Sequence, residues 1–254
     1  MLEKLLKGVL NVLKIENLYK TFSNNQSEEK VILNKLNLTA QKGDFITIIG
    51  GNGAGKSTLM NLISGTIFSD SGKIYIDEKN VTYMPEHKRA KFIGRVFQNP
   101  LNGTAPNLTI EENLFLAVLK KSLKNLKFGI NKKTKEFFKE KLLSLNSGLE
   151  DRLKTKVGLL SGGQRQALTL LMATIVPPKI LLLDEHTAAL DPKSSYNILE
   201  LTQKIAKNSE MITLMITHNM EIATTLGNRI ILLNSGKVEL DIKGENRKSI
   251  NFTA

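Results

Sequence analysis

The apolar residues follow a strand-like pattern at both ends of the chain and a helical pattern in the middle. Short apolar runs separated by polar turns predict strands. They cover residues 12–18, 31–39, 45–49, 73–76 and 95–98 in the first part of the chain, and 180–183, 211–217 and 230–233 in the last. Helical periodicity marks residues 111–121, 134–145 and 166–176, and a further helix is predicted over 192–207.

This order predicts an α/β fold with a helical insertion. The first four runs indicate an antiparallel sheet, whereas the run after residue 179 is apolar on both faces, as expected of a buried parallel strand. We expect one domain over residues 12–254. Residues 12–98 and 177–254 are predicted to form an α/β core with an antiparallel β-subdomain, and residues 99–176 a helical subdomain.

A glycine-rich segment follows the predicted strand at 45–49. Gly50–Thr58 matches the pattern G-x-x-x-x-G-K-[ST] between a strand and a helix. Glycines let backbone N–H groups turn toward a phosphate, and the following helix directs its positive end at the same anion. We expect Lys56 to reach the β- and γ-phosphates and Ser57 to ligate a bridging Mg²⁺. The expected nucleotide contacts of the loop are Gly50, Asn52, Gly53, Ala54, Gly55, Lys56, Ser57 and Thr58.

Two carboxylates, Asp184 and Glu185, close the apolar run that ends at Leu183. Ligands of a doubly wound sheet bind at the carboxyl ends of its strands, where the loop after Ile49 also lies. We expect Asp184 to hold Mg²⁺ through water, and Glu185 to orient or deprotonate the attacking water.

A second glycine pair precedes the third helical segment. Ser161 and Gln164 have the spacing of a capping box, in which each side chain satisfies a backbone N–H of the other residue. Gly162 and Gly163 weaken a helix start but give an anion close access to free amides. The segment therefore predicts a helix N-terminus that also binds phosphate.

Together these motifs resemble the nucleotide-binding subunit of ABC transporters. The resemblance runs from Val12 to about Gly244, with the motifs in the family's order. It implies a P-loop NTPase (RecA-like) core with an antiparallel β-subdomain, an inserted α-helical subdomain and ATPase activity. By this resemblance, Gly50–Thr58 is the Walker A loop, Gln98 the Q-loop glutamine, Leu160–Gln164 the signature, Ile180–Asp184 Walker B, Glu185 the catalytic glutamate, Ala189–Asp191 the D-loop, His218 the switch histidine and Phe22 the aromatic that stacks on adenine.

Four of these positions also have ordinary structural explanations. A core aromatic near a strand end is the less favoured alternative for Phe22, and Asp191 before Pro192 also suits a helix N-cap. A lone histidine at a strand end, such as His218, is unremarkable, and Gln98 alone is a weak signal. The whole constellation assigns His218 to the γ-phosphate and Gln98 to sensing Mg²⁺ and water.

The resemblance implies ATP and Mg²⁺ as ligands, with Ser57, Gln98 and Asp184 at the metal. In the family, two subunits enclose two ATP molecules, each bound by the phosphate loop of one chain and the signature of the other. Ser161 and Gly163 would therefore act on the partner's ATP in an ATP-bound homodimer. The helical subdomain is expected to dock a helix of a multi-span permease at the cytoplasmic face of a bacterial membrane.

One position departs from the family. His186 follows the catalytic glutamate, where the family usually has proline. Proline would restrict the backbone beside the base, so the imidazole either alters local rigidity or marks a subgroup. Because the change leaves Glu185 in place, we still expect ATP hydrolysis.

Composition narrows the possible partners. The net charge of +12 suggests anionic partners, but lysine supplies most of it and arginine, the side chain favoured for base recognition, only six residues. The basic stretch between Lys120 and Lys141 indicates a solvated helical face rather than a binding patch, and we expect no nucleic-acid partner. No window offers about 18 uncharged apolar residues for a membrane span. Residues 1–11 are amphipathic without signal-peptide features and are a predicted N-terminal extension.

Two longer stretches, Tyr83–Pro100 and Leu168–Pro192, resemble ATPases of bacterial importers assigned to tryptophan or tyrosine. Such importers work with a separate permease and a substrate-binding lipoprotein. An exporter ATPase of the lipoprotein-release or peptide-efflux type would share every motif. A soluble ABC ATPase of iron–sulfur assembly or DNA maintenance is the alternative of another class. The DNA type usually contains long coiled coil, and no sustained heptads occur here. We therefore expect a transporter ATPase.

Overall fold

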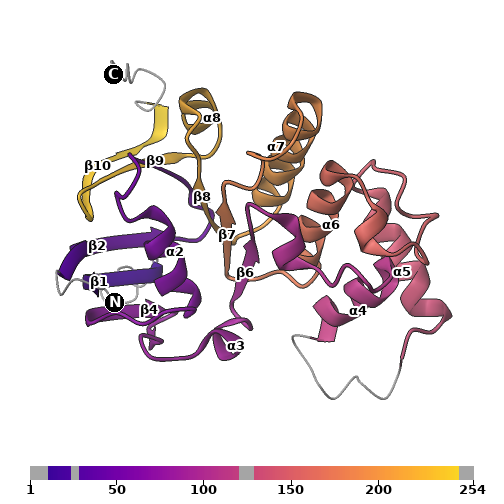
Figure 1. Cartoon of the computed structure of the whole chain (residues 1–254), viewed down its shortest axis with the longest axis horizontal. Helices are drawn as coiled ribbons and strands as arrows, with labels where there is room; N and C mark the ends of the chain where they lie inside the picture. Colours follow the sequence, from indigo (N-terminus) through magenta and orange to yellow (C-terminus); the bar gives the residue numbers. More distant parts are fainter. Residues whose placement is uncertain (1–10, 24–28, 120–128, 246–254) are drawn as a thin grey trace, which may run out of the picture.

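The larger of two sheets runs through the middle of the molecule (Figure 1). The computed structural model describes residues 11–23, 29–119 and 129–245. The strands of this sheet are β3 Phe45–Ile49, β6 Ile93–Val96, β7 Ile180–Asp184, β8 Ile212–Ile216, β9 Arg229–Asn234 and β10 Lys237–Lys243. Their order is β10-β9-β3-β8-β7-β6, and every neighbouring pair is parallel except β10 with β9. The carboxyl ends of β3 and β7 therefore meet at one edge, as predicted for the nucleotide site.

The smaller sheet is antiparallel and has four strands. Its strands are β1 Asn11–Ser23, β2 Glu29–Gln41, β4 Ser71–Ile76 and β5 Lys79–Asn80, in the order β2-β1-β4-β5. Along β2, Leu36, Leu38 and Ala40 are buried while the residues between them are exposed. One face of this sheet therefore packs on the core and the other faces solvent.

The expectation that residues 45–49 join the antiparallel sheet is wrong. All five residues of β3 are buried, and β3 lies in the larger sheet between β8 and β9, parallel to both. A strand that is apolar on both faces suits a sheet covered on both sides, whereas the half-exposed strands of the smaller sheet alternate.

Helix α2 Lys56–Ser64 lies between the two sheets (Figure 1). Leu59, Met60, Leu62 and Ile63 of α2 belong to one buried cluster with residues of both sheets, among them Leu38 of β2 and Ile48 of β3. Because α2 begins directly after the glycine-rich loop, this packing fixes the loop against both sheets.

The opposite face of the larger sheet is covered by α6 Gly162–Thr174 and α7 Pro192–Lys207. Leu170 of α6 is buried with Leu181, Leu183 and Met215 of the sheet, and Leu199 of α7 packs against the same cluster. The described core is thus a three-layer α/β arrangement. The predicted bounds of α7 agree with those observed.

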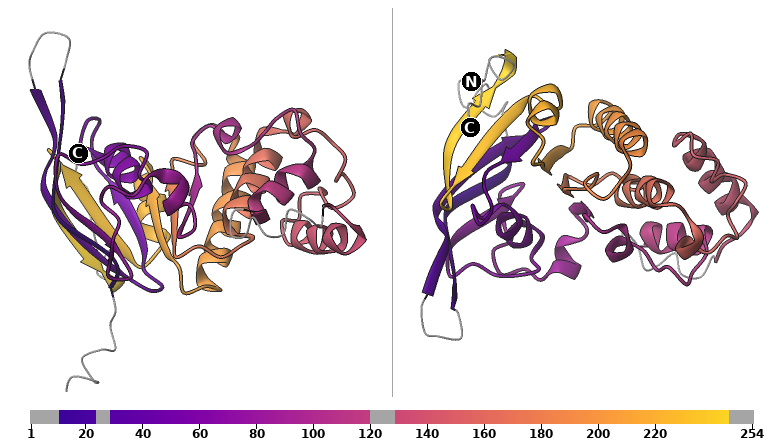
Figure 2. Two further views of the ribbon diagram at one scale, coloured as in Figure 1. Left: turned by 90° about the horizontal axis from the view of Figure 1, so that it is seen from below. Right: turned by 45° about the horizontal axis from the view of Figure 1, so that its top comes forward.

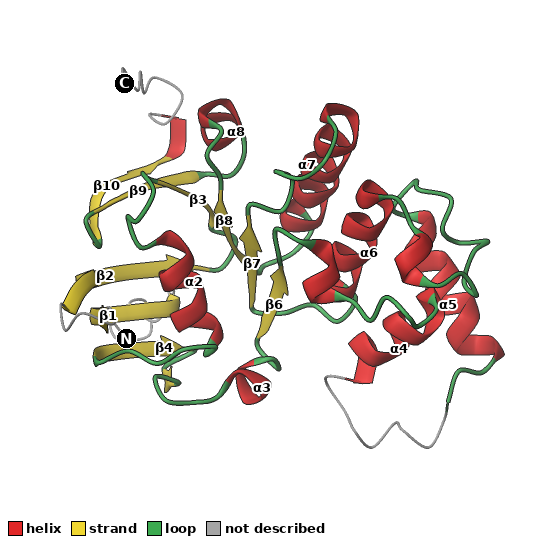
Figure 3. Ribbon diagram, viewed as in Figure 1, coloured by secondary structure: helices red, strands yellow, loops and turns green. Residues whose placement is uncertain are grey.

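Two longer helices lie on the side of the molecule away from the smaller sheet (Figures 2 and 3). They are α4 Ile110–Leu119 and α5 Lys132–Leu143, with the 3-10 turns η1 Pro100–Gly103 and η3 Val157–Leu159. Their own buried cluster includes Leu114, Phe138 and Leu168. Because α6 contributes to this cluster and to the one beneath the sheet, α6 joins the helical insertion to the core.

Several element bounds differ from those predicted. Strand β6 ends at Val96, two residues before Gln98, because its residues pair with β7 only from Ile93 to Val96. Helix α6 begins at Gly162, where the predicted capping box at Ser161 starts it, four residues before the clearest helical periodicity. Short elements that lack a distinct sequence signal were not predicted: α3 Glu86–Arg89, α8 Met220–Thr225 and β10.

Predictions for the ends of the chain fall partly outside the structure. Of the predicted N-terminal extension, residues 1–10 lie outside the described residues, and Asn11 is the first residue of β1. Residues 120–121, predicted as the end of α4, also lie outside them. Within the described ranges, no helix is long and apolar enough to cross a bilayer.

Candidate functional site

The glycine-rich loop between β3 and α2 adopts a backbone that depends on two of its glycines. Gly50 and Gly55 have φ angles of +151° and +99°. A Cβ atom at Gly50 would lie 2.3 Å from the carbonyl oxygen of Leu233, and one at Gly55 would lie 2.6 Å from Cδ2 of Leu33. Both positions therefore exclude a side chain, and the loop can turn its amides toward a ligand.

Lys56, the first residue of α2, points back into the loop. Its side chain is buried, and its Nζ donates hydrogen bonds to the carbonyl oxygens of Gly50 at 2.8 Å and Gly51 at 3.0 Å. Burial lowers the pKa of Lys56, while Glu185 and Asp184 act in the opposite direction. The ammonium group is thus held where anionic oxygens would bind at the helix N-terminus.

A cavity of about 280 Å³, here called the phosphate-loop cavity, brings most of the predicted contacts together. The loop, Glu185 and His218 form its walls, and Phe22 lies at its edge with 44% of its surface exposed. The volume and open mouth suit a phosphate chain rather than a whole nucleotide. The lining residues are Phe22, Ile32, Asn52, Gly53, Ala54, Gly55, Lys56, Ser57, Thr58, Glu185 and His218.

Glu185 and His218 form the closest polar pair of this cavity. Oε1 of Glu185 lies 2.6 Å from Nε2 of His218. Glu185 is a non-glycine residue with a φ of +45°, and its backbone N–H donates to the carbonyl oxygen of Ile216 on β8. A left-handed backbone at a side chain of this kind is uncommon and is held by its surroundings. The turn after β7 therefore aims the carboxylate at the histidine that follows β8.

Asp184 lies at the carboxyl end of β7, next to a cation that the sequence motifs did not reveal. Its Oδ2 is 3.5 Å from a terminal nitrogen of Arg95, which also donates to Oδ1 of Asn61 on α2. Burial raises the pKa of Asp184, and Arg95 lowers it. Arg95 thus connects the end of β7 with α2, a long-range contact that residue spacing does not encode.

The oxygen atoms near Asp184 fit a magnesium ion. Mg²⁺ prefers one or two carboxylate or hydroxyl ligands together with water and phosphate oxygens. Ser57 offers an exposed hydroxyl at the cavity wall, and Asp184, which is not among the lining residues, offers a partly exposed carboxylate at the end of β7. No group of three or more histidine, cysteine or acidic side chains suited to a metal occurs in the described ranges.

Gln98, by contrast, is not brought to this cavity. It is exposed, lies two residues beyond the end of β6, and is absent from the lining of the phosphate-loop cavity. It follows Phe97, whose ring stacks against the Arg95 guanidinium at 4.6 Å. In this structure Gln98 therefore stands at the junction between the core and the helical insertion.

The signature segment also lies apart from the phosphate-loop cavity. Ser161 caps α6 with a full capping box: its hydroxyl accepts from the Gln164 N–H at 3.2 Å, and the Gln164 side chain accepts from the Ser161 N–H at 3.3 Å. Ser161 and Gly162 are exposed. Of Ser161, Gly162, Gly163 and Gln164, none is found among the cavity's lining residues.

The signature segment contacts the start of α7 instead. Asp191 caps α7 by accepting from the Ser194 N–H at 3.0 Å. Hydrogen bonding from the Ser194 side chain, and then from its backbone, lowers the pKa of the Asp191 carboxyl. A Cβ atom at Gly163 would lie 2.7 Å from Oγ of Ser194. The signature and the D-loop are therefore packed together, and both present polar groups to solvent away from their own phosphate loop.

Arg89 is a second arginine whose role the sequence did not indicate. It is fully buried and donates to four backbone carbonyls, those of Leu62, Ile63, Met84 and Thr82, at 2.6 to 2.9 Å. Burial lowers its pKa to about 10. Two of these carbonyls belong to the last turn of α2, where a cation interacts favourably with the negative end of the helix dipole. Arg89 thus anchors the far end of the helix that begins at the phosphate loop.

Three features together define an ATP-binding cassette. They are a phosphate loop, a carboxylate pair after a buried parallel strand, and a separate Ser-Gly-Gly helix cap on an inserted subdomain. The family model described as ABC transporter matches residues 33–188. A tyrosine transport ATP-binding protein of Clostridioides difficile is 46% identical over 240 residues, which cover 94% of this chain and 95% of that protein. The chain belongs to the ABC transporter family, and it is an ATP-binding, ATP-hydrolysing subunit.

Other relatives and solved structures agree with this family. A methionine import ATP-binding protein of Corynebacterium glutamicum is 34% identical over 86% of this chain, although the match spans only 59% of that longer protein. A solved cassette, described as dimeric and bound to ADP and Pi after hydrolysis, superimposes with a TM-score of 0.78 at 30% identity. The match covers 91% of this chain and 98% of the solved chain. The predicted fold class and ATPase activity are confirmed.

Proposed function

We propose that this chain powers the uptake of an aromatic amino acid, of the tyrosine or tryptophan type, by an ABC importer. The observation that carries the proposal is the similarity to a tyrosine transport ATP-binding protein along almost the whole of both chains. The similarity to import proteins for methionine supports the direction of transport. An exporter of lipoproteins or peptides would use the same catalytic residues but a different membrane partner.

At the catalytic site, the phosphate-loop cavity would receive the phosphates of ATP. Lys56 would exchange its loop carbonyls for β- and γ-phosphate oxygens, which are the stronger partners for an ammonium group. Ser57 and Asp184 would hold Mg²⁺, which supplies charge neutralisation for the phosphates when bound. Gln98 would join them only after moving from its exposed position outside the phosphate-loop cavity. Phe22 would stack on adenine at the rim, where the exposed ring already has Lys20 5.4 Å from its centre.

Hydrolysis would proceed by attack of a water molecule held by Glu185. The carboxylate accepts a hydrogen bond from the water, orients it and takes its proton as the bond to the γ-phosphorus forms. The bond between the γ-phosphorus and the bridging oxygen breaks in the same step, and that oxygen leaves with ADP. His218, whose Nε2 lies 2.6 Å from Oε1 of Glu185, would turn this nitrogen to the γ-phosphate. The contact between Glu185 and His218 would then be lost, because His218 would contact the γ-phosphate instead.

The second half of each ATP site would come from another copy of the chain. The signature residues, of which Ser161 and Gly162 are exposed and Gly163 and Gln164 half-buried, are absent from the lining of their own phosphate-loop cavity, as is Asp191. In an ATP-bound homodimer each signature would cover the partner's γ-phosphate with the N-terminus of α6. The dimer would exclude water from the site when closed and release the products when open.

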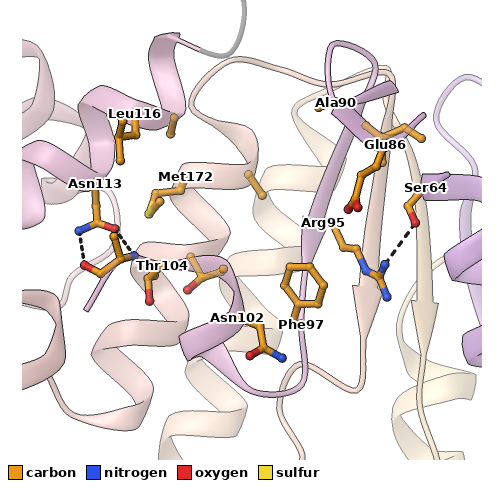
Figure 4. Close-up of a pocket in the computed structure, with 16 residues that line it drawn as sticks. Ser64, Glu86, Ala90, Arg95, Phe97, Asn102, Thr104, Asn113, Leu116 and Met172 are labelled. Atoms are coloured by element: carbon orange, nitrogen blue, oxygen red, sulfur yellow. Dashed lines mark hydrogen bonds between the residues drawn. The ribbon is translucent and has the colours of Figure 1, made fainter. Parts of the chain in front are cut away.

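The permease would dock on the helical insertion. A groove of about 570 Å³ separates α4 and α6 from α3 and β6, and here it is called the insertion groove (Figure 4). Leu116 and Met172 line one side, and Glu86, Arg95 and Phe97 the other. The groove has the mixed apolar and charged lining that a short amphipathic helix requires. We propose a cytoplasmic helix of a multi-span permease as its occupant, which places the chain at the cytoplasmic face of the membrane.

Affinity purification of the Glu185→Gln variant with ATP from mildly solubilised cells tests the importer. We expect a multi-span permease and an extracellular substrate-binding lipoprotein to be recovered with it. The lipoprotein can then be titrated with tyrosine, tryptophan and, as a control, methionine. Recovery of soluble partners alone would retain the ATPase but contradict the transport function.

A further inference from the structure

The residue that departs from the family, His186, is directed into the protein rather than toward the nucleotide. Its side chain is 2% exposed, directly after Glu185 and its left-handed turn. Nε2 of His186 lies 3.1 Å from Oγ1 of Thr202, which is fully buried on α7. The imidazole therefore makes a contact between the catalytic turn and the middle of a long helix.

The direction of this hydrogen bond follows from the protons available. Thr202 has a single hydroxyl proton, and it donates that proton to the carbonyl oxygen of Ile198 at 2.7 Å. The hydroxyl oxygen can then only accept from the imidazole, so Nε2 of His186 carries a hydrogen. A buried N–H of this kind costs free energy when its acceptor is removed, which makes the contact specific for the hydroxyl.

Helix α7 has a second contact that matters for catalysis. Its first turn, at Ser194, packs directly beneath Gly163 of the signature. The same helix thus touches the signature at its start and His186 in its middle. Proline at position 186 would restrict only the local backbone, whereas the imidazole ties the turn to α7 itself.

We propose that His186 is a positioning residue, which holds Glu185 at the correct angle for hydrolysis through its hydrogen bond to Thr202 on α7. The inference rests on the proposed role of Glu185 as the base. Because Glu185 and His186 are consecutive, a shift of the imidazole moves the carboxylate that pairs with His218. A displacement of about 1 Å at a reacting group can lower a rate by about 100-fold.

Thr202→Val tests this inference, since valine keeps the shape of threonine and removes the acceptor. We expect kcat for ATP hydrolysis, counted per nucleotide-binding site, to fall about 10-fold, while the affinity for ATP stays within twofold. Thr202→Ser restores the hydroxyl and should recover most of kcat. Thr174→Val removes a hydroxyl with the same type of helical hydrogen bond, 2.7 Å to Leu170, and should leave kcat unchanged.

A double-mutant cycle separates positioning from general damage. His186→Leu should lower kcat to the same degree as Thr202→Val, and the double variant should be no slower than either single variant. Multiplied effects in the double variant, or a normal kcat for Thr202→Val, would overturn the inference. The Glu185→Gln variant distinguishes failure of the proposed function from failure of this inference. Normal turnover of Glu185→Gln would refute Glu185 as the base. An inactive Glu185→Gln together with a normal Thr202→Val would refute only the positioning role of His186.

Discussion

The phosphate-loop cavity and the signature segment make opposite use of the same kind of element, a glycine-rich helix N-terminus. In the phosphate-loop cavity, Lys56 is buried and Glu185 pairs with His218, so polar groups from three strand ends converge. In the signature segment, the Ser161 hydroxyl accepts a hydrogen bond from a backbone N–H of its own helix, and Ser161 is exposed. The first is an assembled half of a site, and we propose that the second completes the site of another copy of the chain.

This contrast explains why one chain carries both motifs without joining them. If both halves met within a chain, ATP would bind and react without any movement between chains. When the halves belong to different chains, binding of ATP favours a closed dimer and hydrolysis favours an open one. The bound nucleotide then determines the distance between the two subunits. The insertion groove lies beside the subdomain that carries the signature and would transmit this distance to the membrane partner.

Glu185→Gln is the strongest way to break the phosphate-loop half while leaving the signature intact. The amide cannot take a proton from water, so we expect the ATP hydrolysis rate to fall about 1,000-fold. ATP binding should persist, because the amide removes no phosphate contact. Phosphate release under saturating ATP measures the rate. Turnover above about one tenth of the unmodified protein's would move the base to another residue.

Arg89→Met tests whether the phosphate-loop half depends on a scaffold of its own. The change leaves four buried backbone carbonyls without their cation, and we expect the free energy of unfolding to fall by about 3 kcal/mol. Urea denaturation gives this value. Arg152→Met, at a partly exposed position, should change stability by less than about 1 kcal/mol. An equal loss in both variants would show that the carbonyl contacts of Arg89 contribute nothing specific.

Lys56→Ala removes the buried ammonium from the phosphate-loop half. We expect the affinity for ATP to fall about 100-fold, because charge-assisted hydrogen bonds to two phosphate groups are lost. Fluorescence titration with a labelled ATP analogue measures it. Lys42→Ala, which removes an exposed lysine paired with Glu210, serves as the control for lost charge. Unchanged affinity in Lys56→Ala would refute the phosphate-loop assignment.

The acid side of the stability profile tests the environment of His186. Burial lowers the pKa of His186 from 6.5 to about 4, so the native imidazole stays neutral where the unfolded one takes a proton. The unfolded state therefore gains protons as the pH falls below about 6.5, and stability declines. This residue alone should account for about 2 kcal/mol between pH 7 and pH 5. His186→Gln should flatten that slope, and an unchanged slope would contradict the buried neutral imidazole.

The sequence predicted local features of the site and missed its long-range ones. The loop at Gly50–Thr58 and the capping box at Ser161 are written in consecutive residues, because both are turns between a strand or loop and a helix. The contacts of Arg95 with Asp184 and of His186 with Thr202 join residues far apart in sequence, and no periodicity encodes them. Motif spacing alone would not have revealed the contacts of Arg89 or of Arg95.

The same distinction applies to the fold. Periodicity predicted α7 and β3 at their observed bounds, since each is long or uniformly buried. It failed for β10, which alternates between exposed and half-buried residues at a sheet edge, and for the six-residue α8. Short elements at edges are stabilised by tertiary pairing rather than by their own pattern.

The most direct test of the two-halves account changes the signature and follows ATP binding and dimer formation separately. Ser161→Arg is introduced into the Glu185→Gln chain, with Ser144→Arg, at an exposed serine beyond α5, as the matched control. Analytical ultracentrifugation with ATP reports the dimer, and titration at low protein concentration reports ATP binding to the monomer. We predict that Ser161→Arg weakens dimer formation at least 10-fold with the monomer's ATP affinity unchanged. Loss of ATP affinity in the monomer, with the dimer intact, would place the signature in its own chain's site and contradict the account.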